Sequence, residues 1–76
     1  MNVTVYSTPT CPWCKKAKEY LKEKKISFTD VNVAGNQASA QEMIKKSGQM
    51  GVPVIEIDGK IIVGFDKEAL DNALTQ

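Results

Sequence analysis

The sequence predicts an α/β domain in the order β-α-β-α-β-β-α, with a four-stranded mixed sheet and helices on both of its faces. Short runs rich in β-branched residues alternate with proline-free stretches whose apolar residues recur at helical spacing. The first β-α-β unit implies parallel strands joined by a right-handed crossover, whereas the later Asp58-Gly59 pair is typical of an antiparallel hairpin. Because 76 residues suit one modest core, residues 1–76 are expected to form a single domain.

The first half of the chain is expected to alternate strand, helix and strand. Residues 3–6 (Val-Thr-Val-Tyr) alternate as a strand does, and Thr8-Pro9-Thr10 ends the run. A helix is expected from Pro12 to about Lys24, because its apolar residues share one side. The residues on that side are Cys14, Ala17 and Leu21, with Tyr20 beside them. Residues 26–33 are expected to form the second strand, with Phe28, Val31 and Val33 as its apolar members.

The second half is expected to hold a helix, a hairpin and a last short helix. A turn at Ala34-Gly35-Asn36 precedes a helix over residues 38–47, which Gly48 ends. The expected buried stripe of that helix is Ala40, Met43, Ile44 and Ser47. Strands over residues 54–57 and 60–63 flank the Asp58-Gly59 turn. Asp66 then caps a short helix, whose apolar residues are Ala69, Leu70, Ala73 and Leu74.

Charge and composition exclude several classes of function. Ten lysines, without arginine, face nine acidic residues, and a net charge of +1 gives no support for a nucleic-acid binder. The N-terminal run lacks the charged region and the apolar stretch of a signal peptide, and no segment approaches the roughly 18 apolar residues of a membrane span. A cytoplasmic protein with neither nucleic-acid nor membrane partners is therefore expected, in a compartment where thiols stay reduced.

Lysines are concentrated in the first predicted helix. Glu19 and Glu23 dilute this charge, so a solvated helix face is one interpretation. The other is a mild positive field near Cys11, to which Lys15 and Lys16 contribute most. The lysines concerned are Lys15, Lys16, Lys18, Lys22, Lys24 and Lys25.

The sequence Cys11-Pro12-Trp13-Cys14, between a strand and a helix, carries the chemistry. A bridge between cysteines three residues apart closes a tiny loop and adds little stability, so a structural role is disfavoured. Pro12 suits the first helical position and places Cys11 at the N-cap, where its sulfur can accept from the N–H groups of Trp13 and Cys14. These donors and the helix dipole favour a thiolate, so Cys11 is the expected nucleophile.

Cys14 follows one helical turn later, on the same face. It should lie deeper and stay protonated until Cys11 forms a mixed disulfide, which Cys14 then attacks to release the reduced substrate. A Cys–His dyad is impossible because the chain has no histidine. The alternatives are a zinc half-site, which only a dimer could complete because further ligands are absent, and an inert pair.

Trp13 has two interpretations. It could cover the start of the helix as a large apolar residue. Between two reactive thiols at an exposed turn, it is better suited to shape a substrate surface, because aromatic residues are preferred at recognition sites.

Three further blocks, together with the cysteine motif, resemble bacterial glutaredoxins over nearly the whole chain. Thr8-Pro9-Thr10 precedes the motif, and Gly51-Val52-Pro53-Val54 precedes the third strand. Ile57-Asp58-Gly59-Lys60 and Val63-Gly64-Phe65-Asp66 follow near the end. The resemblance implies a thioredoxin-like fold and a thiol–disulfide oxidoreductase with no cofactor.

The resemblance also implies a binding site for glutathione, which acts as a co-substrate. It implies that Pro53 is a cis proline facing the thiols, although only about 5–6% of X–Pro bonds in folded proteins are cis. The backbone of Val52 would then pair with an extended thiol peptide, in the manner of a neighbouring strand. The γ-glutamyl carboxylate would meet the helix start at Gly64-Phe65-Asp66, where free N–H groups suit an anion and Asp66 also serves as the N-cap.

Three residues depart from the common glutaredoxin pattern. Thr8 stands where many members have a lysine, Gly51 where many have a threonine, and Lys67 where many have a second acid. Lys67 itself offers a cation for a carboxylate. The Gly-Phe pair also resembles that of the glutaredoxin-like redoxins that serve ribonucleotide reductase. Those redoxins are reduced by thioredoxin reductase.

The expected activity is glutathione-dependent reduction of protein disulfides and of glutathionylated proteins by a monomer. One alternative is a redoxin that thioredoxin reductase reduces. An alternative of another class is a dimeric carrier of iron–sulfur clusters or metal. The predicted catalytic residues are Cys11 and Cys14, and the predicted glutathione-binding residues are Trp13, Val52, Pro53, Gly64, Phe65 and Asp66.

Overall fold

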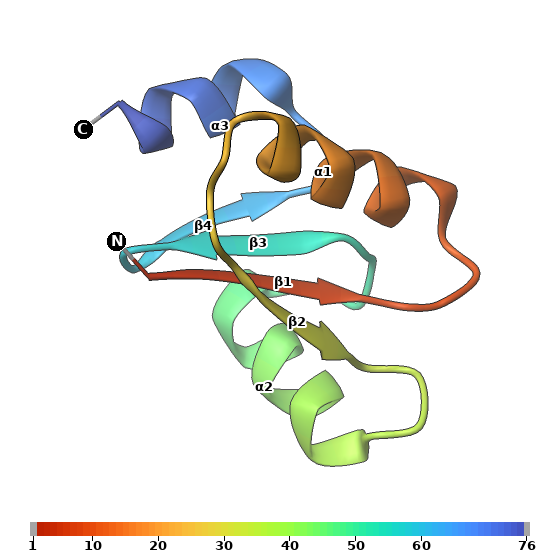
Figure 1. Ribbon diagram of the computed structural model, residues 1–76. Helices are drawn as coiled ribbons and strands as arrows, with labels where there is room; N and C mark the ends of the chain where they lie inside the picture. The colour runs from red at the N-terminus through yellow and green to blue at the C-terminus, as the bar shows by residue number, and fades with distance from the viewer. Residues whose placement is uncertain (1, 76) are drawn as a thin grey trace.

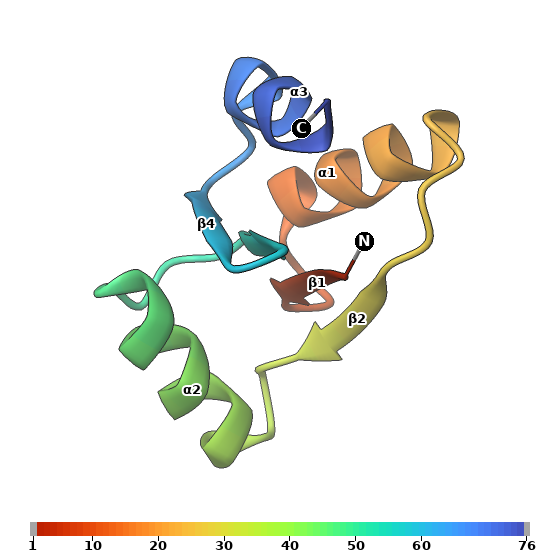
Figure 2. The same cartoon turned by 90° about the vertical axis from the view of Figure 1, so that its left-hand side faces the viewer.

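The computed structural model describes residues 2–75 of the chain. The elements are β1 (Val3–Ser7), α1 (Pro12–Glu23), β2 (Thr29–Asn32), α2 (Gln37–Ser47), β3 (Val54–Ile57), β4 (Lys60–Val63) and α3 (Lys67–Leu74). The strands form a mixed sheet of order β2-β1-β3-β4, in which β1 and β2 are parallel and β3 is antiparallel to both of its neighbours. Figures 1 and 2 show α1 and α3 over one face of the sheet and α2 over the other. The predicted architecture is confirmed.

The alternation of side chains along the strands divides the core between the two faces of the sheet. Residues Val3 and Val5 of β1 pair with Ile57 and Ile55 of β3 and pack beneath α1 and α3. Tyr6 follows Val5 in the strand, so its side chain points to the opposite face of the sheet, where it packs with Met43 of α2. Leu21 of α1 is fully buried, as its place on the predicted apolar side requires. Each face of the sheet is therefore covered by its own helices, and the sheet separates the two clusters of buried residues.

The second strand is shorter than predicted, because only residues 29–32 pair with β1. The Ile26 N–H instead donates to the Leu21 carbonyl oxygen over 3.0 Å, so the chain is still turning away from α1 at this point. Ile26 and Phe28 nevertheless pack against the core. Their apolar character reflects this packing and does not reflect strand pairing.

Polar side chains and turn residues set the ends of the later elements. Asn36 caps α2, and Gly48 ends it with a left-handed φ of 75°, as predicted. On α2 only Met43 is fully buried, whereas the rest of the predicted stripe is half-buried. The predicted hairpin turn has a left-handed φ at both Asp58 and Gly59.

No helix within residues 2–75 is long and apolar enough to cross a membrane.

Candidate functional site

Cys11 lies at the N-cap of α1, as predicted. Its backbone is extended, with φ −96° and ψ 110°, and Pro12 begins the helix. The Cys14 N–H donates to the Cys11 sulfur over 3.1 Å. The Trp13 N–H was predicted as a second donor, and this is wrong: among the hydrogen bonds of the described residues, the Cys11 side chain accepts only from Cys14, the third residue of the helix, and not from Trp13, the second. The partly exposed sulfur therefore has one amide donor and the positive end of the helix dipole.

Cys14 is the buried thiol of the pair, with 1% of its surface exposed. Burial raises the pKa of the Cys14 thiol to about 11, and the hydrogen bond with Cys11 acts in the same direction. The backbone of Thr8 and the charge of Lys18 act in the opposite direction. The two thiols are thus unequal, and Cys14 is protonated at neutral pH.

The loop before β3 approaches Cys11 from the other side of the site. The Val52–Pro53 peptide bond is cis, which confirms what the resemblance implied. The Val52 carbonyl oxygen lies 3.9 Å from the Cys11 sulfur. The Pro53 carbonyl oxygen accepts the Gly64 N–H over 2.8 Å, and this bond ties the loop to the segment that precedes α3.

Gln49 braces the same loop from within, and sequence reasoning did not identify it. Its side-chain carbonyl oxygen accepts the Gly51 N–H over 2.6 Å, and its side-chain amide donates to the Gly51 carbonyl oxygen over 3.0 Å. A Cβ at Gly51 would lie 2.6 Å from the Gln49 oxygen, so a threonine at this position would displace the side chain. The departure at Gly51 is therefore matched by a brace that orients the backbone next to Val52.

An open groove of about 280 Å³ brings together five of the predicted binding residues. The rings of Trp13 and Phe65 stand 6.4 Å apart, and 57% of the Trp13 surface is exposed. Gly64 has a left-handed φ of 80°, which turns the chain from β4 toward α3. The groove is lined by Trp13, Val52, Pro53, Gly64 and Phe65.

Asp66 lies outside the lining of this groove. Its carboxylate accepts the Ala69 N–H over 3.1 Å, so its role as the N-cap of α3 is confirmed. Lys67 is also turned away, because its ammonium lies 5.3 Å from the centre of the Tyr20 ring and lines a separate cavity behind Phe65. Tyr20 in turn contacts Phe65 edge-on and donates to the Asp71 carboxylate, and this chain of contacts supports the groove from α1 and α3.

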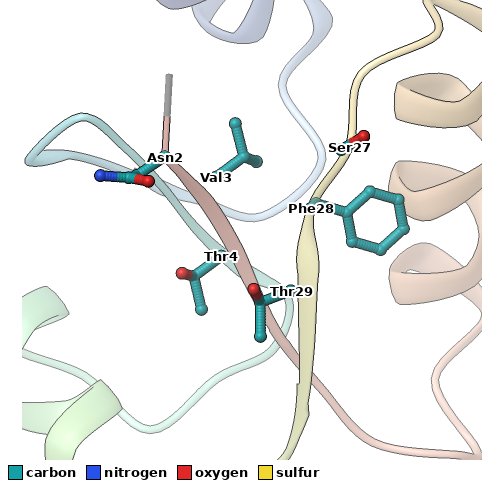
Figure 3. Close-up of a pocket in the computed structure, with 6 residues that line it drawn as sticks. All are labelled: Asn2, Val3, Thr4, Ser27, Phe28 and Thr29. Atoms are coloured by element: carbon teal, nitrogen blue, oxygen red, sulfur yellow. The ribbon is translucent and has the colours of Figure 1, made fainter.

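A larger cavity, of about 360 Å³, lies at the opposite end of β1 (Figure 3). It opens where β1 and β2 begin, and Phe28 projects from it toward α1. Its remaining lining residues are Asn2, Val3, Thr4, Ser27 and Thr29. It holds no thiol or ionisable side chain, whereas the smaller groove includes Val52, whose carbonyl oxygen lies 3.9 Å from the Cys11 sulfur.

Comparison with known proteins shows the family to which the chain belongs. The family model described as glutaredoxin matches residues 3–62. The chain is 60% identical over 72 residues to an uncharacterised glutaredoxin-like 8.6 kDa protein in a rubredoxin operon of Clostridium pasteurianum, covering 95% of this chain and 96% of that protein. It is 46% identical over 65 residues to glutaredoxin 3 of Escherichia coli K12, covering 86% and 78% of the two chains. The glutaredoxin structure from Archaeoglobus fulgidus matches with a TM-score of 0.92 and 25% identity, covering 99% and 87%.

A thioredoxin-like fold with a Cys-x-x-Cys pair at the start of its first helix defines the class of thiol–disulfide oxidoreductases. Within that class, the chain belongs to the glutaredoxin family.

Proposed function

We propose that this protein reduces disulfides with electrons from glutathione, and that Cys11 is the attacking and Cys14 the resolving thiol. The observation that carries the proposal is the inequality of the two thiols. Cys11 is partly exposed at a helix N-terminus, where an amide donates to its sulfur, whereas Cys14 is buried behind it. A nucleophile needs access and a stabilised negative charge, and a resolving thiol needs only proximity.

The reaction follows from these positions. The Cys11 thiolate attacks one sulfur of the substrate disulfide, and the other substrate sulfur leaves as a thiolate. Cys14 then attacks the Cys11 sulfur of the mixed disulfide, so the bound substrate thiol departs and a Cys11–Cys14 disulfide remains. Two molecules of reduced glutathione regenerate the dithiol and leave as one glutathione disulfide. A glutathionylated substrate can be reduced through Cys11 alone. Cys11 takes the glutathione from the substrate, whose thiolate leaves, and a second glutathione then resolves the mixed disulfide between Cys11 and the first.

Three features of the groove support glutathione as the thiol bound there. The Val52 backbone lies beside the Cys11 sulfur, in place to hydrogen-bond an extended cysteinyl peptide. The neighbouring Trp13 and Phe65 rings give the groove an apolar lining. At the start of α3, the Asp66 cap engages only the Ala69 N–H, and the remaining first-turn amides suit the γ-glutamyl carboxylate.

One observation favours a second candidate, a redoxin that thioredoxin reductase reduces. The five residues that line the groove include no cation, and Thr8 stands where many glutaredoxins have a lysine for the glycine-end carboxylate. Two lysines lie near the groove without lining it, since the Lys16 ammonium is 4.7 Å from the centre of the Trp13 ring and the Lys67 ammonium lies over Tyr20. With no cation in the lining itself, glutathione binding would rest more on backbone groups and would be weaker.

A pair of coupled assays separates the two candidates. In the first, a glutathionylated peptide is reduced by glutathione, glutathione reductase and NADPH, and we expect turnover that depends on the protein. In the second, thioredoxin reductase and NADPH replace the glutathione system. Turnover in the second assay alone would overturn the glutathione proposal and support the redoxin.

A metal carrier is the candidate of the other class, and it requires ligands from outside a single chain. Within residues 2–75, no group of three or more histidine, cysteine, aspartate or glutamate side chains lies together. Purification without oxygen, followed by absorption spectroscopy and measurement of mass in solution, tests this candidate. A coloured dimer that loses its colour in Cys11→Ser would support the carrier.

A further inference from the structure

A polar cluster beneath the cysteine helix joins three elements that are distant in sequence. Ser7 ends β1, Lys18 lies on α1 and Asp30 lies on β2. The Ser7 hydroxyl donates to one Asp30 carboxylate oxygen over 2.8 Å, and the Lys18 ammonium lies 3.0 Å from the other. Lys18 also donates to the Ser7 hydroxyl oxygen over 3.3 Å. Two of these contacts hold the ammonium and the third holds its two partners together, whereas a surface lysine is ordinarily mobile.

The cluster lies next to the buried thiol. Lys18 follows Cys14 by four residues, so the two side chains are neighbours on one face of α1. Ser7, which is 2% exposed, immediately precedes Thr8, whose backbone acts to lower the pKa of the Cys14 thiol. The side chain of Lys18 is itself only 24% exposed, so solvent screens its charge less than that of a free surface lysine. The cation that Ser7 and Asp30 hold therefore belongs to the residue one helical turn after the thiol that must ionise within the protein.

We propose that Lys18 is a positioning residue for the resolving step, because Asp30 and Ser7 hold its ammonium where it stabilises the Cys14 thiolate. This inference rests on the proposed roles of the two cysteines. In that step the Cys14 thiol gives its proton to solvent and its sulfur bonds to the Cys11 sulfur. The bond between Cys11 and the substrate sulfur breaks, and the substrate leaves with the electron pair as a thiolate, which takes up a proton from solvent.

Other charged groups in the neighbourhood do not duplicate this role. The charged and ionisable groups that act on Cys14 are Cys11 and Lys18, and of these only Lys18 favours the thiolate. Asp30 is acted on by Lys18 and Lys22. Although partial burial raises the pKa of the Asp30 carboxyl, its bonds with Ser7 and Lys18 lower it by more, so the anchor stays ionised at neutral pH. Lys22 has no direct contact with Cys14 among those described, so it provides a matched control.

The test uses dithiobisnitrobenzoate, an aromatic disulfide whose thiolate is coloured, so it does not depend on glutathione. In stopped flow, the fully reduced protein should release two equivalents of the coloured thiolate in succession. The first reports the attack of Cys11 on the reagent, and the second reports the attack of Cys14 on the resulting mixed disulfide. Cys14→Ser should retain the first release and lose the second.

Lys18→Met should slow the second release and leave the first unchanged. Each unit by which the pKa of a thiol rises lowers its thiolate fraction about tenfold and raises its nucleophilicity about threefold, so we expect a loss of at most about threefold near neutral pH. The loss should diminish as the pH is raised and Cys14 ionises in both proteins, which a general structural defect would not produce. Lys18→Arg should restore the rate, and Lys22→Met should match the unmodified protein.

Several results would overturn the inference. One is a second release in Lys18→Met as fast as in the unmodified protein, and another is an equal slowing in Lys22→Met. A third is a slowing in Lys18→Met that is the same at every pH. Circular dichroism checks that Lys18→Met is folded, and Lys18→Gln repeats the measurement with a polar replacement. If the first release persists in Cys11→Ser, the proposed roles of the cysteines fail, and the assay reports that failure separately.

Discussion

The burial of Cys14 should make the stability of this protein fall at alkaline pH. The folded protein holds this thiol at a pKa of about 11, whereas the ordinary value is 9.0. Burial is the main cause, and 99% of the residue's surface is withdrawn from solvent, since only 1% is exposed. The unfolded chain therefore loses the Cys14 proton at a lower pH than the folded protein does. Stability from the protonated thiol is fully present below about pH 9 and is lost as the pH rises toward 11.

The size of the loss follows from the two pKa values. With a difference of about two units, the free energy of unfolding should drop by about 2 kcal/mol between pH 9 and pH 11 because of this one group. For a small domain such a drop is a large share of total stability. Lysines titrate in the same range, so the contribution of Cys14 has to be isolated by comparison.

Urea unfolding isolates the contribution of Cys14 to the pH dependence of stability. The unmodified protein and Cys14→Ala are measured in parallel, under anaerobic and reducing conditions, from about pH 8 to about pH 11. Loss of the side chain shifts the Cys14→Ala curve by a constant amount, while the lysine contributions cancel. We expect the unmodified protein to lose about 2 kcal/mol more than the variant over the range. Parallel curves would show that Cys14 is not held protonated by its surroundings, and the reasoning would fail.

Three further predictions concern the site and its supports. Cys11→Ser should abolish the reduction of glutathionylated peptides while Cys14→Ser retains it, and equal loss in the coupled glutathione assay would contradict the assigned roles. Asp66→Ala should lower the free energy of unfolding by about 1 kcal/mol, since it removes the N-cap of α3, and an unchanged urea midpoint would contradict that role. Gln49→Ala should raise the KM for a glutathionylated peptide about twofold to tenfold with little change in kcat, because two hydrogen bonds that orient the loop beside Val52 are lost. An unchanged KM would show that the loop keeps its position without the Gln49 brace.

Local patterns were sufficient to predict most elements and the placement of the thiols. β3 and β4 have the predicted bounds, because two four-residue runs, each with three apolar residues, flank a turn whose residues adopt a left-handed φ. The N-cap position of Cys11 followed from Pro12 next to it, and the burial of Cys14 followed from its place one turn further along. These features depend on residues close in sequence, so a local reading captures them.

Two of the errors arose where distant segments decide the outcome, whereas the third, the Trp13 donor, is set by the local geometry of the N-cap. β2 was predicted to begin at Ile26, yet an edge strand extends only as far as its one partner, and pairing with β1 begins at Thr29. The stripe of α2 was predicted to be more buried than it is, because the contact area of a helix depends on the sheet beneath it. Trp13 was expected to donate to Cys11, but the turn into α1 brings only the Cys14 amide to the sulfur among the described bonds.

The sequence by itself determined the order of the elements, the helix caps and the inequality of Cys11 and Cys14, because helical spacing and capping act within a few residues. Tertiary structure decided what surrounds the thiols. It brought the Val52 carbonyl to the Cys11 sulfur, added Phe65 to the lining of the groove, and held the Lys18 ammonium against Ser7 and Asp30. These contacts join residues up to dozens of positions apart, and only the packing of the helices on the sheet sets their distances.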